Sequence, residues 1–240
     1  MRVVLGEHGH RELHRRGGTD LSDPNIAVVV FPGSNCEQDV VYALNREGAS
    51  ADYAWHADGD LGGADAVVLP GGFAHGDYLR TGAIARFSPV MRAVGRMADD
   101  GKPVLGICNG FQILAEAHLV PGALRKNEGL RFLCTWTELV VEDTGTIATR
   151  GLDKGQRLRI PINHYEGNYT PGDASPRIAF RYADNPNGAW QDVAGVSNAA
   201  GNVVGMMPHP ERASETWLGS TDGRGVLASL VASCAVPAGR

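Results

Sequence analysis

The chain has 240 residues, enough for one large α/β domain or two small ones. A hydrophobic content of 43% and a charged content of 20% are ordinary for a globular protein, and a net charge of −5 without a basic cluster gives no support for nucleic-acid binding. No apolar run approaches the roughly 18 residues that span a bilayer, no segment resembles a signal peptide, and the four cysteines form no C-x-x-C pair. We therefore expect a cytoplasmic protein without a membrane partner, a metal site or a disulfide scaffold.

The first 24 residues differ from the rest. They contain four Arg, four acidic residues and three His, and they show no sustained apolar period. We interpret residues 1–24 as a flexible N-terminal extension or as a start codon assigned too early. The histidines are too irregularly spaced to be assigned as ligands. We expect one domain over residues 25–240, because the sequence shows no internal repeat and no linker.

Strands and helices alternate in the first half of the chain. A continuous apolar run predicts a buried strand at 26–31, and further strands are predicted at 51–55, 66–69 and 103–107. Ser34 and Glu37 form an S-x-x-E capping box, which predicts a helix through about Glu47 that ends at Gly48. A second helix is predicted from apolar residues at 3.6-residue spacing, namely Ile84, Phe87, Met91, Val94 and Ala98.

After Gly122 the pattern changes to strands with few helices between them. Strands are predicted at 132–141, 157–162, 177–182 and 203–207, and a last helix at 224–233. The fold class is therefore α/β, with a mostly parallel, doubly wound sheet flanked by helices and additional strands in the C-terminal half.

A candidate nucleophile lies where the strand at 103–107 turns into a helix. Cys108 stands there between Gly106 and Gly110, which is the G-x-nucleophile-x-G form of a nucleophile elbow with Cys in place of Ser. The N-terminus of the following helix favours the thiolate, the reactive form of cysteine. Because most lone cysteines are small core residues, Cys108 alone leaves both interpretations open.

Two further strand ends carry unusual residues, and in open α/β sheets the site lies at these ends. Gly71 and Gly72 follow the strand at 66–69. The sequence M-P-H-P-E follows the strand near residue 206, and it places His209 and Glu211 two residues apart in a Pro-stiffened segment. A carboxylate beside a histidine can fix its tautomer and stabilise its cation, as in a triad. Alone, His209 is better explained as a turn histidine; together with the elbow it becomes a candidate base.

These motifs resemble the triad type of class I glutamine amidotransferase. The resemblance covers about residues 25–233 and is closest to the glutaminase subunits of phosphoribosylformylglycinamidine synthase. It is carried, in order, by P-G-S-N-C-E, P-G-G-F-A-H-G-D-Y-L-R-T-G-A-I-A, G-I-C-N-G-F-Q-I-L, Y-A-D-N-P-N-G and M-M-P-H-P-E-R. The Asn-Gly-Phe after the cysteine separates this family from amidotransferases with Leu-Gly there. The resemblance implies a flavodoxin-like fold.

The resemblance also implies a catalytic triad. Cys108 attacks the side-chain amide of L-glutamine, His209 takes the thiol proton and hands it to departing ammonia, and Glu211 orients His209. A γ-glutamyl thioester forms, and water then releases glutamate. The ammonia passes to a synthetase that uses ATP to convert formylglycinamide ribonucleotide to formylglycinamidine ribonucleotide in purine biosynthesis.

The same resemblance implies an oxyanion hole, a substrate contact and partner chains. The oxyanion donors are backbone N–H groups of the Gly71–Gly72 turn and of Asn109, and Gln112 lines the substrate pocket. The chain contains neither G-x-x-x-x-G-K-[ST] nor G-x-G-x-x-G, so we expect no cofactor here. ATP and Mg would be used by a large synthetase subunit, with a small accessory subunit completing the complex.

Cys36 and His164 are weaker candidates. Cys36 also follows a strand but lacks the elbow pattern, so we assign it no chemistry and expect a packing role near the pocket. Tyr165 replaces the usual glycine of the family after His164, and Ala74-His75 replaces the commoner Ser-Tyr. These departures concern contacts to the partner protein or glutamine entry.

Two other classes of function compete with the ammonia-donating subunit. A stand-alone cysteine-elbow hydrolase or peptidase of the related α/β group often has histidine directly after the cysteine, where this chain has Asn109. A non-catalytic assembly subunit would have no need of the complete set of Cys108, His209 and Glu211.

Overall fold

The computed structural model describes residues 23–173 and 175–235. The predicted extension over residues 1–24 therefore lies outside the described residues, apart from Asp23 and Pro24. The Pro24 carbonyl accepts a hydrogen bond from the Ser50 N–H at 2.9 Å. Backbone pairing thus begins one residue before the predicted start of the domain.

A nine-stranded sheet organises the described residues, in the order β2-β1-β3-β4-β11-β10-β9-β6-β7. Its strands are β1 (Asn25–Val30), β2 (Ser50–Trp55), β3 (Ala66–Leu69), β4 (Val104–Ile107), β6 (Leu133–Val141), β7 (Arg157–His164), β9 (Arg177–Tyr182), β10 (Val193–Ser197) and β11 (Val203–Met206). The first five strands in this order run parallel, and the pairs from β11 to β7 are antiparallel. The parallel part has the flavodoxin-like order 2-1-3-4-5, so the predicted fold class is confirmed.

The central strands are short and apolar because both faces of the sheet are covered. Every residue of β3, β4 and β11 is buried. The residues of the edge strand β2 are exposed or half-buried instead. A separate two-stranded sheet pairs β5 (Ala123–Arg125) with β8 (Asn168–Thr170).

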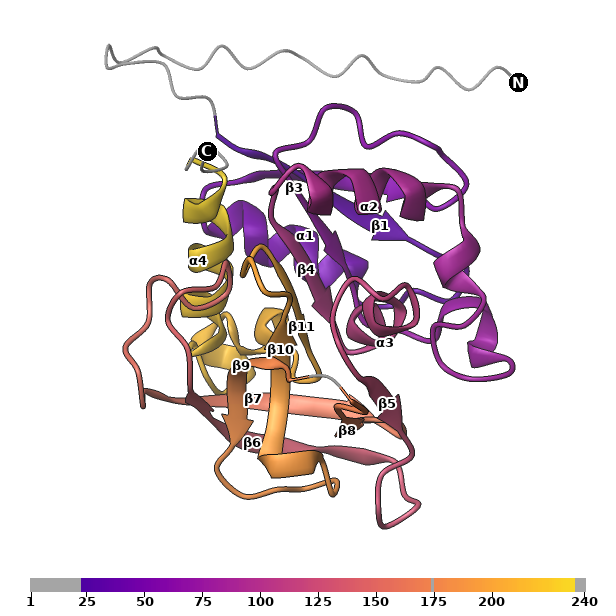
Figure 1. Cartoon of the computed structure of the whole chain (residues 1–240). Helices are drawn as coiled ribbons and strands as arrows, with labels where there is room; N and C mark the ends of the chain where they lie inside the picture. The colour runs from indigo at the N-terminus through magenta and orange to yellow at the C-terminus, as the bar shows by residue number, and fades with distance from the viewer. Residues whose placement is uncertain (1–22, 174, 236–240) are drawn as a thin grey trace, which may run out of the picture.

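Four α-helices cover the parallel part of the sheet: α1 (Glu37–Arg46), α2 (Val90–Asp99), α3 (Asn109–Glu116) and α4 (Gly223–Ser233). α1 and α4 contact each other on one face of the sheet, and α2 and α3 lie on the opposite face (Figure 1). The connection from β1 to β2 and the connection from β3 to β4 run in opposite directions across the sheet. Because such crossovers are right-handed, their helices α1 and α2 lie on opposite faces. Short 3₁₀ helices span η1 (Ala74–Asp77), η2 (Ala85–Phe87), η3 (Trp190–Asp192), η4 (Pro210–Ala213) and η5 (Thr216–Leu218). Within residues 23–173 and 175–235, the helices are too short or too polar to traverse a bilayer.

Two predicted helices differ from the structure. The capping box at Ser34 is wrong: α1 begins only at Glu37, and the Ser34 hydroxyl accepts a hydrogen bond from the Phe31 N–H at 3.0 Å. Ser34 is held by its pairing with Gly72 and cannot start a helix. The helix predicted over 84–98 is split by Pro89 into η2 and α2, which leaves Phe87 74% exposed rather than on the buried face.

Candidate active site

Cys108 lies at the junction of β4 and α3 in a strained conformation, with φ = 52° and ψ = −106°. A residue with a side chain rarely adopts this conformation, and surrounding structure must hold it there. Part of that support is the bond from the Cys108 N–H to the Met206 carbonyl of the neighbouring β11, at 2.7 Å. Only 4% of Cys108 is exposed. The predicted strand-to-helix elbow is therefore present in the structure.

The two glycines beside Cys108 are required by lack of space. A Cβ atom on Gly106 would lie 2.5 Å from the Leu114 Cδ1 atom and 2.7 Å from the Gly110 backbone. On Gly110 it would lie 1.9 Å from the Leu69 carbonyl oxygen of β3. The elbow thus packs backbone directly against backbone, which fixes where the sulfur stands.

His209 and Glu211 follow β11 and form a buried pair. The His209 Nδ1 atom lies 2.6 Å from the Glu211 Oε1 atom, and the two residues are only 1% and 2% exposed. Burial opposes the imidazolium, but the Glu211 carboxylate and Cys108 outweigh it and hold the pKa of His209 well above its usual range. Among the described residues no partner is found for the His209 Nε2 atom. This nitrogen is free to exchange a proton with a bound molecule.

One cavity of about 300 Å³ brings most of the predicted site residues together. Its wall includes Gly72, Cys108, Gln112 and His209, and this volume is at the small end of ligand pockets. The other residues that line it are Asn35, Cys36, Phe73, Asp77, Thr81, Phe132, Asn163, His164, Tyr165 and Glu166. A larger hollow of about 710 Å³ beside β5 and β8 contains no cysteine or histidine.

Backbone N–H groups are available where an oxyanion would form. In the described part of the chain, no acceptor is found for the N–H of Gly72 or of Asn109, the first residue of α3. Gly72 has φ = 152°, and a Cβ atom there would lie 2.6 Å from the Gly33 carbonyl. Gly71 is placed differently, because it does not line the cavity and its carbonyl accepts the N–H groups of Asn35 and Cys36.

Asn109 and Gln112 form a buried polar network at the start of α3. The Asn109 side chain accepts a hydrogen bond from the Ala74 N–H at 3.0 Å and donates to Gln112 Oε1 at 2.9 Å and to Asp77 Oδ1 at 3.2 Å. Gln112 in turn donates to the Glu166 carbonyl at 2.6 Å. The side chain of Gln112 therefore holds the segment that carries Glu166 against the cavity.

Two acidic residues at the cavity were missed by sequence reasoning. Burial raises the pKa of Asp77 to about 6, with a further contribution from the Glu166 charge, although the hydrogen bond from Asn109 opposes the shift. The Glu166 carboxylate accepts a hydrogen bond from the Thr81 hydroxyl at 3.0 Å. Asp77 falls inside a quoted family motif and Glu166 follows Tyr165, but charged residues in loops do not indicate which cavity they reach.

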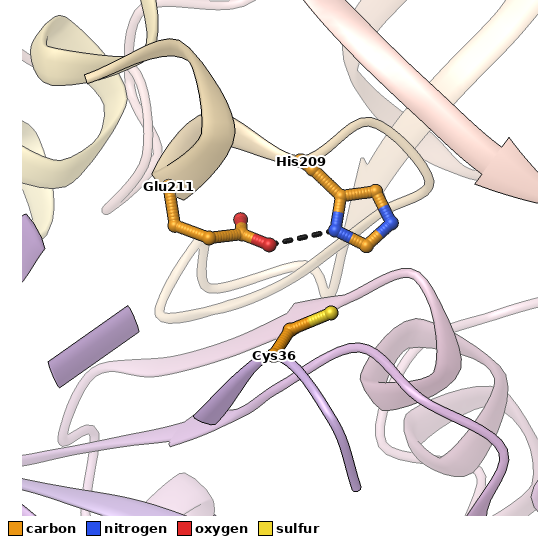
Figure 2. Close-up of side chains that lie close together, drawn as sticks. All are labelled: Cys36, His209 and Glu211. Atoms are coloured by element: carbon orange, nitrogen blue, oxygen red, sulfur yellow. Dashed lines mark hydrogen bonds and ion pairs between the residues drawn. The ribbon is translucent and has the colours of Figure 1, made fainter. Parts of the chain in front are cut away.

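Cys36 lies beside the proposed base His209, whereas the sequence predicted only a packing role near the pocket. The ligand-type atoms of Cys36, His209 and Glu211 all lie within 4.8 Å of one another, and Figure 2 shows the sulfur directed toward the other two side chains. Burial raises the pKa of the Cys36 thiol, against opposing contributions from His209 and Arg212, so the thiol stays neutral. The Arg212 Nη2 atom lies 3.2 Å from this sulfur, and a cation there opposes a metal ion, so we retain the prediction of no metal ligand.

His164 lines the same cavity from the end of β7. Its Nδ1 atom lies 3.2 Å from the Asn127 side-chain oxygen, and its Nε2 atom has no partner among the described residues. Burial, with a smaller effect of His209, lowers the pKa of His164 to about 4, so the ring is neutral. Of the two departures from the family pattern, Tyr165 lines the cavity and His75 does not.

Comparison with known proteins identifies the family of the chain. Residues 23–225 match the family model of the CobB/CobQ-like glutamine amidotransferase domain. The subunit PurQ of phosphoribosylformylglycinamidine synthase from Rubrobacter xylanophilus is 52% identical over 218 residues, which cover 88% of this chain and 99% of that protein. The PurQ subunit from Koribacter versatilis is 51% identical over 227 residues, with coverage of 88% and 98%.

The chain belongs to the PurQ family of glutamine amidotransferases.

Solved structures agree with this membership. A chain of the PurLQS structure from Thermotoga maritima has 42% identity to this protein and a TM-score of 0.85, covering 88% of this chain and 98% of that chain. A glutamine amidotransferase from the same organism has 17% identity and a TM-score of 0.61, and covers 88% of this chain and 97% of its own; this likeness shows the fold alone. PurQ relatives therefore match nearly all of the residues that form the sheet and the cavity.

Proposed function

We propose that this chain is the glutaminase subunit of phosphoribosylformylglycinamidine synthase, which hydrolyses L-glutamine and supplies ammonia for purine biosynthesis. The function follows from membership of the PurQ family at about half identity. The observation that carries the chemistry is the strained Cys108 elbow, which shares one cavity with the buried His209–Glu211 pair. The same membership argues against a stand-alone peptidase and against a subunit without catalytic activity.

In the reaction, the Cys108 sulfur attacks the side-chain amide carbon of glutamine. The resulting oxyanion is held by the N–H groups of Gly72 and Asn109, each of which can contribute about 3 kcal/mol of transition-state stabilisation. His209 donates its proton to the amide nitrogen, the C–N bond breaks, and ammonia leaves. The product is a γ-glutamyl thioester on Cys108.

Water completes the cycle. His209, now neutral, accepts a proton from a water molecule that attacks the thioester carbon, and the C–S bond breaks to give glutamate and the Cys108 thiolate. The balance is one glutamine and one water consumed for one glutamate and one ammonia. Glu211 stabilises each imidazolium state of His209 through the bond at 2.6 Å.

The ammonia must reach a second active site, since no nucleotide-binding motif occurs in this chain. We propose that a large synthetase subunit binds ATP, Mg and formylglycinamide ribonucleotide, that a small accessory subunit completes the assembly, and that this chain itself holds no cofactor. The name of the PurLQS structure from Thermotoga maritima indicates such an assembly for a relative of this chain. The pathway places the complex in the cytoplasm.

The test replaces Cys108 by Ala in the reconstituted complex. We expect glutamine-dependent synthesis to vanish while synthesis from added ammonia persists, because only the ammonia source is removed. Labelling with diazo-oxo-norleucine followed by mass spectrometry should place the adduct on Cys108. Retained glutamine-dependent activity, or an adduct on Cys36 instead, would disprove the assignment of the nucleophile.

A further inference from the structure

Cys36 is 173 residues from His209 in the sequence, yet backbone contacts fix it beside this ring. The N–H groups of Asn35 and Cys36 both donate to the Gly71 carbonyl at 3.3 Å, and Ser34 pairs with Gly72. The turn after β1 is thereby fastened to the end of β3. The sulfur position is set by these contacts and does not depend on a flexible side chain.

The missing side chain of Gly71 lets the sulfur and the imidazole ring approach each other. A Cβ atom on Gly71 would lie 3.1 Å from the Cys36 Sγ atom and 2.6 Å from the His209 Cε1 atom. Both groups therefore pack against the same point of the backbone. This explains the glycine at a position that does not line the cavity.

The Cys36 thiol has two polar partners and is buried. It donates to the Asn35 side-chain oxygen, with a distance of 3.2 Å from the sulfur, and it accepts a hydrogen bond from the Arg212 Nη2 atom at 3.2 Å. The Arg212 Nε atom lies 3.4 Å from the Asp39 carboxylate. Cys36 and Asp39 of the α1 region thus both contact the Arg212 guanidinium.

The guanidinium has a competing partner close by. One oxygen of Glu211 is bonded to His209, but the other, Oε2, is buried and has no partner in the described part of the chain. A carboxylate with a free oxygen is a strong acceptor for arginine, because a bidentate pair adds two charge-assisted hydrogen bonds. If the Arg212 guanidinium turned to the Glu211 carboxylate, that carboxylate would stabilise the imidazolium of His209 less.

Charged and titratable groups lie around His209 on the elements packed against it. Glu211 and Arg212 face it from η4, Cys108 from the elbow, His164 from the end of β7, and Cys36 from the start of α1, with Asp39 one helical turn further on. We propose that Cys36 is a positioning residue for the base His209. Its sulfur holds the Arg212 guanidinium, so that the Glu211 carboxylate stays paired with His209 alone. The proposal rests on the proposed function, since it acts through the base of that reaction.

The test compares Cys36→Ala with Cys36→Ser in the reconstituted complex. Alanine removes the acceptor for Arg212, whereas serine keeps one. We expect Cys36→Ala to lower kcat for glutamine hydrolysis about tenfold with little change in KM, as loss of a supporting hydrogen bond near a catalytic group does. Cys36→Ser should recover most of this loss. The exposed Cys134, replaced by Ala, is the matched control and should leave kcat unchanged.

A pH profile separates positioning from packing. The rate of Cys108 alkylation by iodoacetamide, followed by mass spectrometry of its peptide, should need about one unit higher pH in Cys36→Ala to reach half its maximum. The double variant Cys36→Ala with Arg212→Gln should return toward the wild-type profile, because the competing cation is gone. If Cys36→Ala does not fold, Cys36→Val keeps the site filled with an apolar side chain that offers no acceptor, and it should show the same shift.

Two results would overturn the proposal: a wild-type pH profile in Cys36→Ala, or a Cys36→Ser variant as defective as Cys36→Ala. A failure of the proposed function is distinguishable from either. In that case the complex that carries Cys108→Ala with Cys36 intact would retain glutamine-dependent activity.

Discussion

The close contact between α3 and β3 makes Gly110 the most restrictive residue of the site. A Cβ atom there would lie 1.9 Å from the Leu69 carbonyl oxygen and 2.6 Å from the Leu69 carbonyl carbon, against at least 3.4 Å for an ordinary contact. In Gly110→Ala, α3 must therefore move about 1.5 Å away from β3 (3.4 − 1.9), since both contacts are with backbone. Overpacking of this kind costs about 3 kcal/mol, which lowers the melting temperature of a chain of this size by roughly 6–12 °C.

The same movement displaces Cys108 and the Asn109 N–H group, because they begin the helix that shifts. A misplacement of about 1 Å at a reacting group can reduce a rate about 100-fold, so folded Gly110→Ala should lose at least this much glutaminase activity. Gly95 is the matched control: it lies within α2, and a Cβ atom there meets nothing within 4 Å. Gly95→Ala should keep full activity and gain about 0.5–1 kcal/mol of stability.

The test measures thermal unfolding and glutamine hydrolysis in the complex for both Gly110→Ala and Gly95→Ala. A Gly110→Ala variant that melts within about 2 °C of the wild type and keeps its activity would refute the reasoning from steric contact.

Two further predictions concern the polar network at the cavity. The pKa of Asp77 is about 6 in the folded protein, above its usual 3.8, so the folded state binds the proton more tightly and stability falls as pH rises from about 4 to 6. Asp77→Asn keeps the acceptor for Asn109 but removes the charge, so its melting temperature should exceed that of the wild type at pH 7.5 and not at pH 4. A melting-temperature difference between variant and wild type that is equal at both pH values would contradict this. Gln112→Ala loses the bond to the Glu166 carbonyl that shapes the cavity wall, so it should raise the KM for glutamine about tenfold and change kcat little; an unchanged KM in steady-state assays would show that Gln112 does not support the glutamine site.

The parallel part of the fold could be predicted because its signal is local. The strands from β1 to β4 and β11 are apolar runs between turn residues, except for the edge strand β2, and their predicted bounds hold within one or two residues. β10 was missed, although all five of its residues are buried. It is short and contains Gly195, which weakens the local strand signal even though its partners β9 and β11 are the neighbouring strands along the chain.

The two wrong helix starts have different causes. The S-x-x-E pattern at Ser34 is a valid capping box locally, but pairing of Ser34 with Gly72, a segment outside any local window, takes precedence. The 3.6-residue period through Phe87 continues across Pro89, where the chain turns. Here the deciding signal is local, because proline cannot donate a backbone hydrogen bond inside a helix, and the apolar period masked it.

The elbow was predictable as chemistry, whereas its surroundings were not. Gly106, Cys108 and Gly110 lie within five residues of one another, and His209 and Glu211 are two residues apart. The local geometry of each motif can therefore be predicted from its own sequence. Which strand ends meet follows from the sheet order. The position of Cys36 against Arg212 depends on how the turn after β1 is fastened to Gly71, and that involves segments far apart in the chain.

Two cysteines of the cavity, Cys36 and Cys108, lie near His209, and their surroundings give them different roles. Cys108 stands in a strained elbow next to N–H groups that have no acceptor among residues 23–173 and 175–235, so charge on a bound substrate can be stabilised there. Cys36 is neutral, because burial disfavours its thiolate, and Asn35 and Arg212 already occupy its polar contacts. Cys36 therefore supports the catalytic histidine, whereas Cys108, whose neighbouring N–H groups can bind an oxyanion, performs the reaction.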